Sequence, residues 1–561
     1  MVDSVTLEVV RNACVAVAEE MNATLVRTSY SPNIKDRRDC SCALFDAEGR
    51  MVSQAENIPV HLGAMPASVA AAVEAFPPDS LSEGDAVLLN DPFHGGAHLP
   101  DLTLVTPVFV DGELSAFAAN RAHHADIGGG RAGSVAADST EIYQEGLRLP
   151  PVKLFEAGEP NEDVLSVLLA NVRTPDERRG DLRAQHAANR TGVRRFRELV
   201  ERHGADTMRE ATEEVLSYSE QRMRTELSAL PDGSYGFRDH LDDDGQGTTD
   251  LPVEVTVRVD GDAVTVDFEG TADQVPGAIN APLAVTASAT YYAVRCVTDP
   301  DIPPNAGAYR PITVEAPAGT IVNARPPAAV VGGNLEVSQR VTDALLGAFA
   351  ERVPQRAVAA AQGTMNSVTF GGTDHRSGSP FAFYETIGGG YGGRASGDGM
   401  DGVHAHMSNT LNTPAEVLET AYPLRVREYA LRPDTGGAGE HRGGLGLRRT
   451  IAARADGTTF SLLADRRRHA PYGVAGGASG APGADSVTVD GETEAVPSKS
   501  THRLDAGDAV TVRTPGGGGY GDPADRADAA LARDLRLGKV TPEHVRSAYD
   551  RAPDELVGDG S

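Results

Sequence analysis

The stretch LTLVTPVFVDGELSAFAANRA (residues 102–122) predicts a β-hairpin. Asp111-Gly112 is a typical two-residue turn, and the segments on both sides of it are rich in β-branched, aromatic and other apolar residues. Pro107 indicates that the first strand lies at a sheet edge or carries a bulge, because proline cannot donate a hydrogen bond to a neighbouring strand. We therefore expect two antiparallel strands joined at this turn.

The open end of this hairpin brings potential metal ligands together. If the turn consists of its two central residues alone, Asp101 lies opposite Ala122 and Pro100 lies opposite His123. A register error of a residue or two would change which side chains face each other, but not which segments are neighbours. The imidazole and carboxylate groups collected there are those of His94, His98, Asp101, His123, His124 and Asp126, with Asp91 just upstream.

Imidazole and carboxylate groups at one end of a sheet suit a divalent transition metal such as Mn²⁺, Fe²⁺ or Zn²⁺. Two histidines and one carboxylate also leave coordination positions open, as catalysis requires. We favour His98, Asp101 and His123 as the ligands and regard Asp91 as a weaker ligand candidate. The alternative is that these residues only stabilise turns, as they often do in loops. The candidates for a general base, or for holding the ligands in place, are His124 and Asp126.

The composition limits the possible functions. The chain has 561 residues, of which 40% are hydrophobic and 23% charged, and this is typical of a globular protein with several domains. The formal net charge is -29 and only four residues are lysine, which argues against nucleic-acid binding. We interpret the acidity as an adaptation to a salt-rich cytoplasm. The absence of a long apolar segment or a leader predicts a soluble, cytoplasmic protein without a membrane partner.

The cysteines do not indicate a disulfide framework, because there are only four in a chain of this length. Cys40 and Cys42 alternate in DCSCALFD, so they would share one face of a strand. We expect both to be small buried side chains, with a reactive thiol as the less favoured alternative.

Three glycine clusters, at residues 388–393, 436–446 and 516–523, raise the question of a nucleotide site. A phosphate-binding loop needs a lysine and a hydroxyl residue after its last glycine, and the only Gly-Lys pair is followed by valine. We therefore expect the glycines to permit tight turns and close backbone packing, and we expect no nucleotide site in this chain.

The hydrophobic patterns predict an α+β or mixed α/β fold with several domains, mixed β-sheets and packed helices. Helical spacing is clear in residues 4–27 and 60–76, residues 160–230 are helical and charged, and alternation in residues 253–270 predicts a second hairpin. We expect the following domains: an N-terminal α/β domain with the His/Asp cluster (1–230), a β-rich domain (231–330), a glycine-rich α/β domain (331–523) and a helical C-terminal tail (524–561).

Several long motifs together resemble the hydantoinase B/oxoprolinase family. They are NDPFHGGAHLPDLTLVTPVF, RAHHADIGG, EIYQEGLRLPPVKL, SPNIKDRRDCSCALFD and NIPVHLGAMP, and the resemblance covers nearly the whole chain. The family includes the B subunits of ATP-dependent N-methylhydantoinases, the C-terminal half of 5-oxoprolinase and the α subunit of acetone carboxylase.

The resemblance implies a hetero-oligomer in which an A-type subunit of actin-like fold binds ATP and phosphorylates the substrate. In acetone carboxylase the related subunit holds manganese on His, Asp and His. The H-x-x-D…H spacing of that pattern is matched by His98, Asp101 and His123, so the resemblance implies the same ligand roles for them. The length of the chain favours the hydantoinase type of subunit.

The reaction implied by the resemblance is the ATP-dependent hydrolysis of a cyclic amide, a five-membered lactam or hydantoin. The partner would phosphorylate the carbonyl oxygen, and water activated by the metal would attack the carbon. Asp126, His124 or the more distant Glu145 would accept the proton. Arg121 is a candidate for contact with the phosphoryl group, and a structural salt bridge is its alternative role.

Two further functions remain open at this stage. One is an acetone carboxylase-like subunit that carboxylates a ketone, and the other is a non-catalytic scaffold for the ATP-binding subunit. His404 and His406 would share a face if their segment were extended, and they would line a substrate cleft or a subunit interface, or serve packing alone. The sequence assigns them no role.

Overall fold

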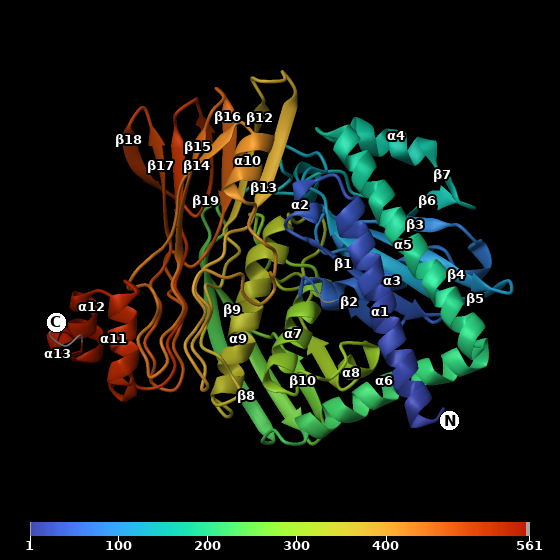
Figure 1. Ribbon diagram of the computed structural model, residues 1–561, viewed down its shortest axis with the longest axis horizontal. Helices are drawn as coiled ribbons and strands as arrows, with labels where there is room; N and C mark the ends of the chain where they lie inside the picture. The colour runs from blue at the N-terminus through green and yellow to red at the C-terminus, as the bar shows by residue number, and fades with distance from the viewer. Residues whose placement is uncertain (1, 56, 557–561) are drawn as a thin grey trace.

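The predicted hairpin lies at the centre of a seven-stranded antiparallel sheet in the computed structural model, which describes residues 2–55 and 57–556 (Figure 1). The strand order is β2-β1-β5-β4-β3-β6-β7. The strands are β1 (Cys40–Asp46), β2 (Met51–Ala55), β3 (Ala86–Leu89), β4 (Asp101–Val110), β5 (Glu113–His123), β6 (Val152–Glu156) and β7 (Glu159–Pro160).

The register of this hairpin differs from the prediction by one residue at its open end. Val110 pairs with Glu113 as expected, but a bulge between Val108 and Phe109 shifts the rest of the ladder. Asp101 therefore lies opposite His123. The extra residue of this bulge is Ser115 in β5, so the bulge is not in the first strand, where Pro107 had predicted one. β4 is not an edge strand of the sheet, since β5 and β3 are its neighbours, but its pairing with β3 ends at Val105, before Pro107.

Helices cover both faces of this sheet. One face packs against α1 (Ser4–Thr28) and α5 (Pro175–His203), and Cys40 and Cys42 are buried among apolar side chains on that face. The other face packs against α3 (His61–Ala75). The predicted buried cysteines are thus confirmed, and the faces alternate as a β-strand requires. In Figure 1, α1 and α5 cross in front of the sheet.

A second sheet, of order β11-β10-β9-β8, follows in the chain. The predicted hairpin at residues 253–270 is confirmed, because β9 and β10 pair antiparallel across it. The elements of this region are α6 (Ala205–Leu227), β8 (Gly233–Asp243), β9 (Thr249–Asp260), β10 (Ala263–Asp267), α7 (Leu283–Val297), α8 (Ala306–Tyr309), β11 (Ile312–Glu315) and α9 (Ser338–Ala350). The largest hydrophobic core joins this sheet, α7 and α9 to α3 and the first sheet.

Two further sheets, of orders β13-β12-β16-β19 and β14-β15-β20-β17-β18, form the C-terminal region at the upper left of Figure 1. Their strands are β12 (Ser367–Thr373), β13 (Pro380–Glu385), β14 (Leu424–Leu431), β15 (Leu447–Ala453), β16 (Thr458–Leu463), β17 (Ala484–Val489), β18 (Glu492–Val496), β19 (Lys499–Leu504) and β20 (Ala509–Arg513). The remaining helices are α2 (Pro32–Lys35), α4 (Glu162–Ala170), α10 (Ala415–Ala421), α11 (Asp528–Arg536), α12 (Pro542–Tyr549) and α13 (Pro553–Leu556).

The three glycine clusters lie in extended segments that run between these sheets and the C-terminal helices (Figure 1). The segments bond to one another through their backbones: Gly444 N–H donates to Tyr391 O (2.8 Å), Gly517 N–H to Gly444 O (2.9 Å) and Gly437 N–H to Gly517 O (2.8 Å). Because adjacent backbones are in direct contact, there is no space for side chains between them. The glycines thus serve close backbone packing, as predicted.

The Gly390→Ala substitution is expected to lower the free energy of unfolding by about 3 kcal/mol, a severe case of overpacking. A Cβ atom at this position would lie 2.1 Å from Gly444 O and 2.2 Å from Gly517 N, so two backbone segments would have to move. Thermal unfolding followed by circular dichroism measures the loss. The matched control is Gly397→Ala, where a Cβ atom meets no atom within 4 Å. Equal melting temperatures for the two variants would contradict this view of the glycine segments.

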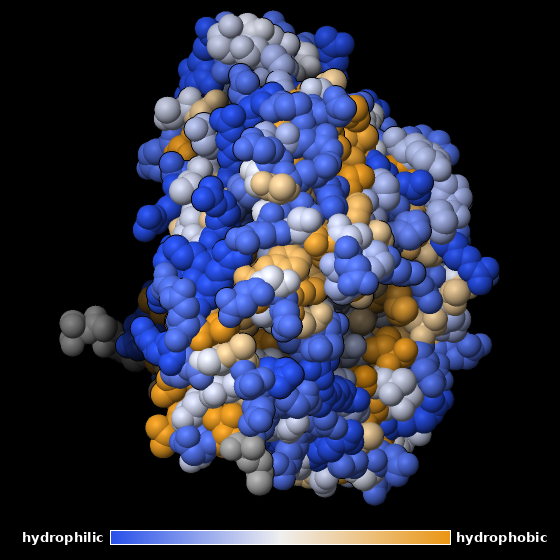
Figure 2. Space-filling view, turned by 90° about the vertical axis from the view of Figure 1, so that its right-hand side faces the viewer, coloured by the Kyte–Doolittle hydropathy of each residue, from blue (hydrophilic) through white to orange (hydrophobic). Residues whose placement is uncertain are grey.

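The surface seen in Figure 2 is largely hydrophilic, with hydrophobic groups in separate patches. None of the helices in the described part of the chain combines the length and the hydrophobicity that a membrane-spanning segment requires.

Candidate metal centre

Three predicted ligands meet at the open end of the hairpin. Asp101 is the first residue of β4, His123 is the last residue of β5, and His98 precedes β4 by one tight turn. All three side chains are buried, and one potential ligand atom from each lies within 4.8 Å of the others. His98 Nδ1 is 3.0 Å from Asp101 Oδ2. The register shift at the bulge helps to assemble the trio, because it places Asp101 opposite His123.

The polar atoms of this trio lack satisfactory hydrogen-bond partners. Apart from the contact between His98 Nδ1 and Asp101 Oδ2, no hydrogen bond satisfies these buried groups: His98 Nε2, Asp101 Oδ1 and His123 Nε2 have no partner. Burying such atoms without compensation costs free energy, so a native protein retains them where a ligand completes their bonding. Two imidazoles and a carboxylate are a donor set for a divalent transition metal. The residues present therefore fit the metal that the sequence predicts.

The residues of this cluster shift one another's pKa values. Burial raises the pKa of Asp101, but the neighbouring His98 and His61 reverse this effect and hold it well below its usual range. Burial and the charge of His98 lower the pKa of His123 well below its usual value. An ionised carboxylate and a neutral imidazole are the forms that bind a metal.

A set of residues around the trio fixes the ring of His123. Asn33 Nδ2 lies 3.0 Å from His123 Nδ1 and donates to the backbone oxygen of His123 (2.7 Å), while the Tyr384 ring stacks on the same imidazole with 4.6 Å between centroids. Arg37 bonds to Asn33 Oδ1 and donates to the backbone oxygen of Tyr384 (3.0 Å). The C-terminal strand β13 thereby helps to cover a site built on the first sheet.

His61 approaches the trio from the first turn of α3. Its Nε2 lies 3.7 Å from Asp101 Oδ2, and its Nδ1 lies 2.9 Å from the Ser41 hydroxyl. Sequence reasoning about spacing missed His61, Asn33 and Tyr384. The only signal was that His61 and Asn33 stand inside the motifs NIPVHLGAMP and SPNIKDRRDCSCALFD, while nothing local distinguishes Tyr384.

Two predicted aspartates lie outside the trio and are held by other partners. Asp91 accepts from the backbone of Phe93 (3.0 Å) and pairs with His94 Nδ1 (2.8 Å). Asp126 accepts from the backbone of Gly133 (3.1 Å) and from the guanidinium of Arg173 (2.8 Å), among other donors. A carboxylate with this many donors is poorly suited to take a proton from water.

The other predicted residues have different environments. His124 Nε2 lies 2.9 Å from Gln185 Oε1, its Nδ1 is unpartnered, and burial together with Arg178 lowers its pKa to about 4. Glu145 is buried, accepts from the backbone of Val331 (3.0 Å), and has a pKa raised by burial to about 8. It therefore carries a proton near neutral pH.

Arg121 lies on the same face of the sheet as His123 and bonds mainly to its neighbours. Its Nε donates to the Thr103 hydroxyl (2.9 Å) and one Nη donates to the Ser68 hydroxyl (2.7 Å). The other Nη is unpartnered. The guanidinium thus joins β4, β5 and α3 and keeps one N–H group for a further acceptor.

The chain is similar to known proteins over nearly its whole length. The family model described as hydantoinase B/oxoprolinase matches residues 3–523. The putative B-type subunit of a D-/L-hydantoinase from a Pseudomonas species is 37% identical over 98% of this chain and 95% of its own length. 5-oxoprolinase 1 from Arabidopsis thaliana is 38% identical over 92% of this chain, which spans only 42% of the plant protein. The crystal structure of ATP-dependent caprolactamase from Pseudomonas jessenii matches with a TM-score of 0.91 at 32% identity, covering 98% of this chain and 96% of that one.

Proposed function

The chain belongs to the hydantoinase B/oxoprolinase family, and from this premise we propose that it is the hydrolytic B-type subunit of an ATP-dependent cyclic amidase. The substrate is a five-membered lactam or hydantoin whose carbonyl oxygen is phosphorylated by an A-type partner subunit. The observation that carries the proposal is the buried trio of His98, Asp101 and His123, in which His98 Nε2, Asp101 Oδ1 and His123 Nε2 have no hydrogen-bond partner. The relatives named hydantoinase, 5-oxoprolinase and caprolactamase support the ring-opening class of reaction.

The trio would hold a divalent metal, Mn²⁺, Fe²⁺ or Zn²⁺, through its imidazole nitrogens and one carboxylate. When bound, such a metal supplies Lewis acidity and lowers the pKa of a water molecule. The remaining residues keep this centre ordered and dry. Asn33 orients the His123 ring through Nδ1, and Tyr384 covers its face. His61 contacts the ligand carboxylate of Asp101.

The predicted proton acceptors have different environments, and we therefore propose different roles for them. His124 is neutral at pH 7, because its pKa is lowered to about 4, and its free Nδ1 can accept a hydrogen bond from water. Glu145 is protonated at that pH and acts as a donor rather than a base. We retain His124 as the acceptor and give Asp126 a purely structural role. The unpartnered Nη of Arg121 is the group we propose for a phosphoryl oxygen.

The reaction class is tested with the chain in complex with its ATP-binding subunit. The complex is supplied with ATP and either 5-oxoproline or hydantoin, and ring-opened product is quantified. A parallel assay with ATP, acetone and bicarbonate tests carboxylation. Ring opening that depends on ATP supports the proposal. Carbon fixation without ring opening, or ring opening by the partner alone, contradicts it.

The Asn33→Ala substitution is expected to weaken metal binding about 10–100-fold, because the ring of His123 loses the amide that fixes its orientation. Metal affinity measured by competition with a chelator gives the size of the effect. Asn171→Ala is a suitable control, since its exposed amide bonds only to Val167 within its own helix. A wild-type affinity in Asn33→Ala would show that the amide does not support the centre.

A further inference from the structure

A surface groove lies on the side of α3 that faces α7 and α8. Its volume is about 660 Å³, within the range of sites that bind ligands, and the loop that leads to His98 forms one of its borders. Its walls are mainly apolar and include Pro66 and Ala67 of α3, Leu283 and Ala287 of α7, and the stacked rings of Tyr291 and Tyr309. A contiguous apolar surface of this kind is typical of a site that binds another molecule.

The charge of this groove is opposite to that of the chain as a whole. The chain has 80 acidic residues against 51 lysines and arginines, and its formal net charge is -29. Among the described residues, the groove lining contains three arginines, Arg50, Arg310 and Arg325, and no aspartate or glutamate. The groove is therefore complementary to a ligand that combines apolar groups with negative charge.

Arg325 is the arginine most available to such a ligand. It is exposed, and it forms no ion pair with any residue that the structure describes. Arg50 and Arg310 have carboxylate partners that do not line the groove, and both pair with Glu213, at 2.7 and 3.5 Å. Their charges are partly neutralised by these partners, so a bound anionic group is met mainly by Arg325.

The groove is connected to the metal centre by direct contacts. Gly95 and Ala67 both line it, and a Cβ atom on Gly95 would lie 2.4 Å from Ala67 O, so the loop and α3 touch through their backbones. The backbone oxygen of Gly95 accepts from the Ser68 hydroxyl (2.6 Å), which in turn accepts from Arg121 (2.7 Å). His98 follows three residues after Gly95. A molecule in the groove therefore contacts the loop that leads to a predicted ligand and to the support of Arg121.

We propose that this groove is the docking site for an acidic segment with apolar side chains that belongs to the ATP-binding partner subunit. This docking role rests on the proposed function, in which that subunit phosphorylates the substrate. A phosphorylated lactam reacts with water, so the centre that forms it and the centre that hydrolyses it have to lie close together. Docking against the loop between Gly95 and His98 brings the partner next to the trio.

Two side chains of the groove contribute to docking in different ways. Leu283 is 44% exposed, so a partner segment that covers it gains the free energy of removing a leucine side chain from water. Arg325 attracts the acidic groups of the segment, and a charge at the rim of an interface acts mainly on the rate of association and on its dependence on salt.

The two histidines that the sequence left without a role lie outside this groove. The segment of His404 and His406 is not a strand, so the two side chains do not share a face. His404 Nδ1 lies 3.2 Å from the Ser408 hydroxyl, and His406 is buried. The proposed subunit contact therefore does not include them.

The test measures the association of the full chain with the purified ATP-binding subunit. Leu283→Glu is expected to raise the dissociation constant about 10-fold or more, because it replaces an apolar contact by a charge of the same sign as the segment. Arg325→Glu is expected to lower the association rate about 10-fold at low salt and less at high salt. With saturating partner, both variants should open the ring at the wild-type kcat, since neither residue contacts the metal centre.

The matched controls are Leu537→Glu and Arg425→Glu. Leu537 is 58% exposed beside the C-terminal helices, Arg425 is exposed on β14, and neither lines the groove. Both controls should associate with the subunit as the wild type does. Losses in the controls as large as those in Leu283→Glu and Arg325→Glu would overturn the docking site, since they would show a general effect of added negative charge.

The remaining outcomes separate the docking site from the proposed function. Wild-type association of both groove variants overturns the docking site and leaves the proposed function intact. A dimer of the free chain that Leu283→Glu dissociates, or binding of benzoate that Arg325→Glu abolishes, assigns the groove to a second copy or to a small anion. Either result, with unchanged affinity for the subunit, also overturns the docking site. A wild-type chain that does not associate with the subunit overturns the proposed function, and the docking site with it.

Discussion

The His98→Ala and His123→Ala variants are expected to lose the bound metal and to lower the ring-opening activity of the complex by about 10³-fold or more. Each substitution removes one of two imidazoles from a three-residue donor set, and the Lewis acid that these residues would hold contributes several kcal/mol of transition-state stabilisation. Metal content measured by mass spectrometry on the purified chain and product formation by the complex give the two readouts. Both should fall together.

The matched control for these variants is His94→Ala. His94 stands in the same loop and is the most conspicuous histidine of the motif, but its side chain is 67% exposed and pairs with Asp91. It should retain metal and activity. Full activity and an unchanged metal content in His98→Ala would remove the catalytic role of the trio and favour the scaffold alternative.

The hairpin and the proximity of His98, Asp101 and His123 were predictable, because the residues that determine them lie close together in the chain. Asp111-Gly112 defines a turn, the strands on both sides are apolar, and the fold back brings His98 and Asp101 to His123 whatever the exact register. The bulge was not placed, because its extra residue, Ser115, lies in β5, whereas Pro107 directed the prediction to the first strand. The bulge shifts the register by one residue, which changes the directly opposite residues but leaves the same segments side by side.

The surroundings of the trio could not be predicted from the sequence, because they depend on contacts between distant segments. Tyr384 stacks on His123 from a strand of another sheet, and His61 reaches Asp101 from α3. No periodicity or spacing relates such positions. The family resemblance supplied the candidate ligands because they lie in one motif pair, whereas residues contributed singly by remote elements leave no comparable pattern.

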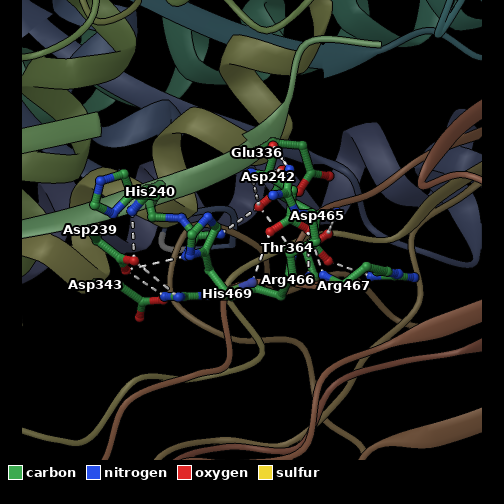
Figure 3. A network of polar contacts seen from close by, with 12 residues as sticks. Asp239, His240, Asp242, Glu336, Asp343, Thr364, Asp465, Arg466, Arg467 and His469 are labelled. Atoms are coloured by element: carbon green, nitrogen blue, oxygen red, sulfur yellow. Dashed lines mark hydrogen bonds and ion pairs between the residues drawn. The ribbon is translucent and has the colours of Figure 1, made fainter. Parts of the chain in front are cut away.

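Removal of a charge from the buried ion network of Figure 3 is expected to have the largest effect on the free energy of unfolding. Asp465 is fully buried and accepts from Arg340 (2.7 Å), from Lys499 (3.0 Å) and from the backbone of Arg466 (2.9 Å). Asp465→Ala leaves two buried cations with one less counter-ion each, and the free energy of unfolding is expected to fall by about 3–5 kcal/mol. Asp250→Asn is the control, because Asp250 pairs with Arg468 and His469 at the surface and asparagine tolerates its left-handed backbone (φ +57°); it should cost less than about 1 kcal/mol.

The same carboxylate predicts how this stability depends on pH. Burial raises the pKa of Asp465, but Lys499 and Arg340 lower it more, so its folded-state pKa lies below the ordinary value of 3.8. A group with a lowered folded-state pKa contributes stability above its unfolded pKa, and this contribution disappears as the pH falls through the folded value. Unfolding by acid, followed by circular dichroism, should therefore begin at a higher pH in Asp465→Asn, whose shape is unchanged, than in the wild type. An identical acid transition in both proteins would mean that the charge of Asp465 does not hold β8, α9 and the loop after β16 together.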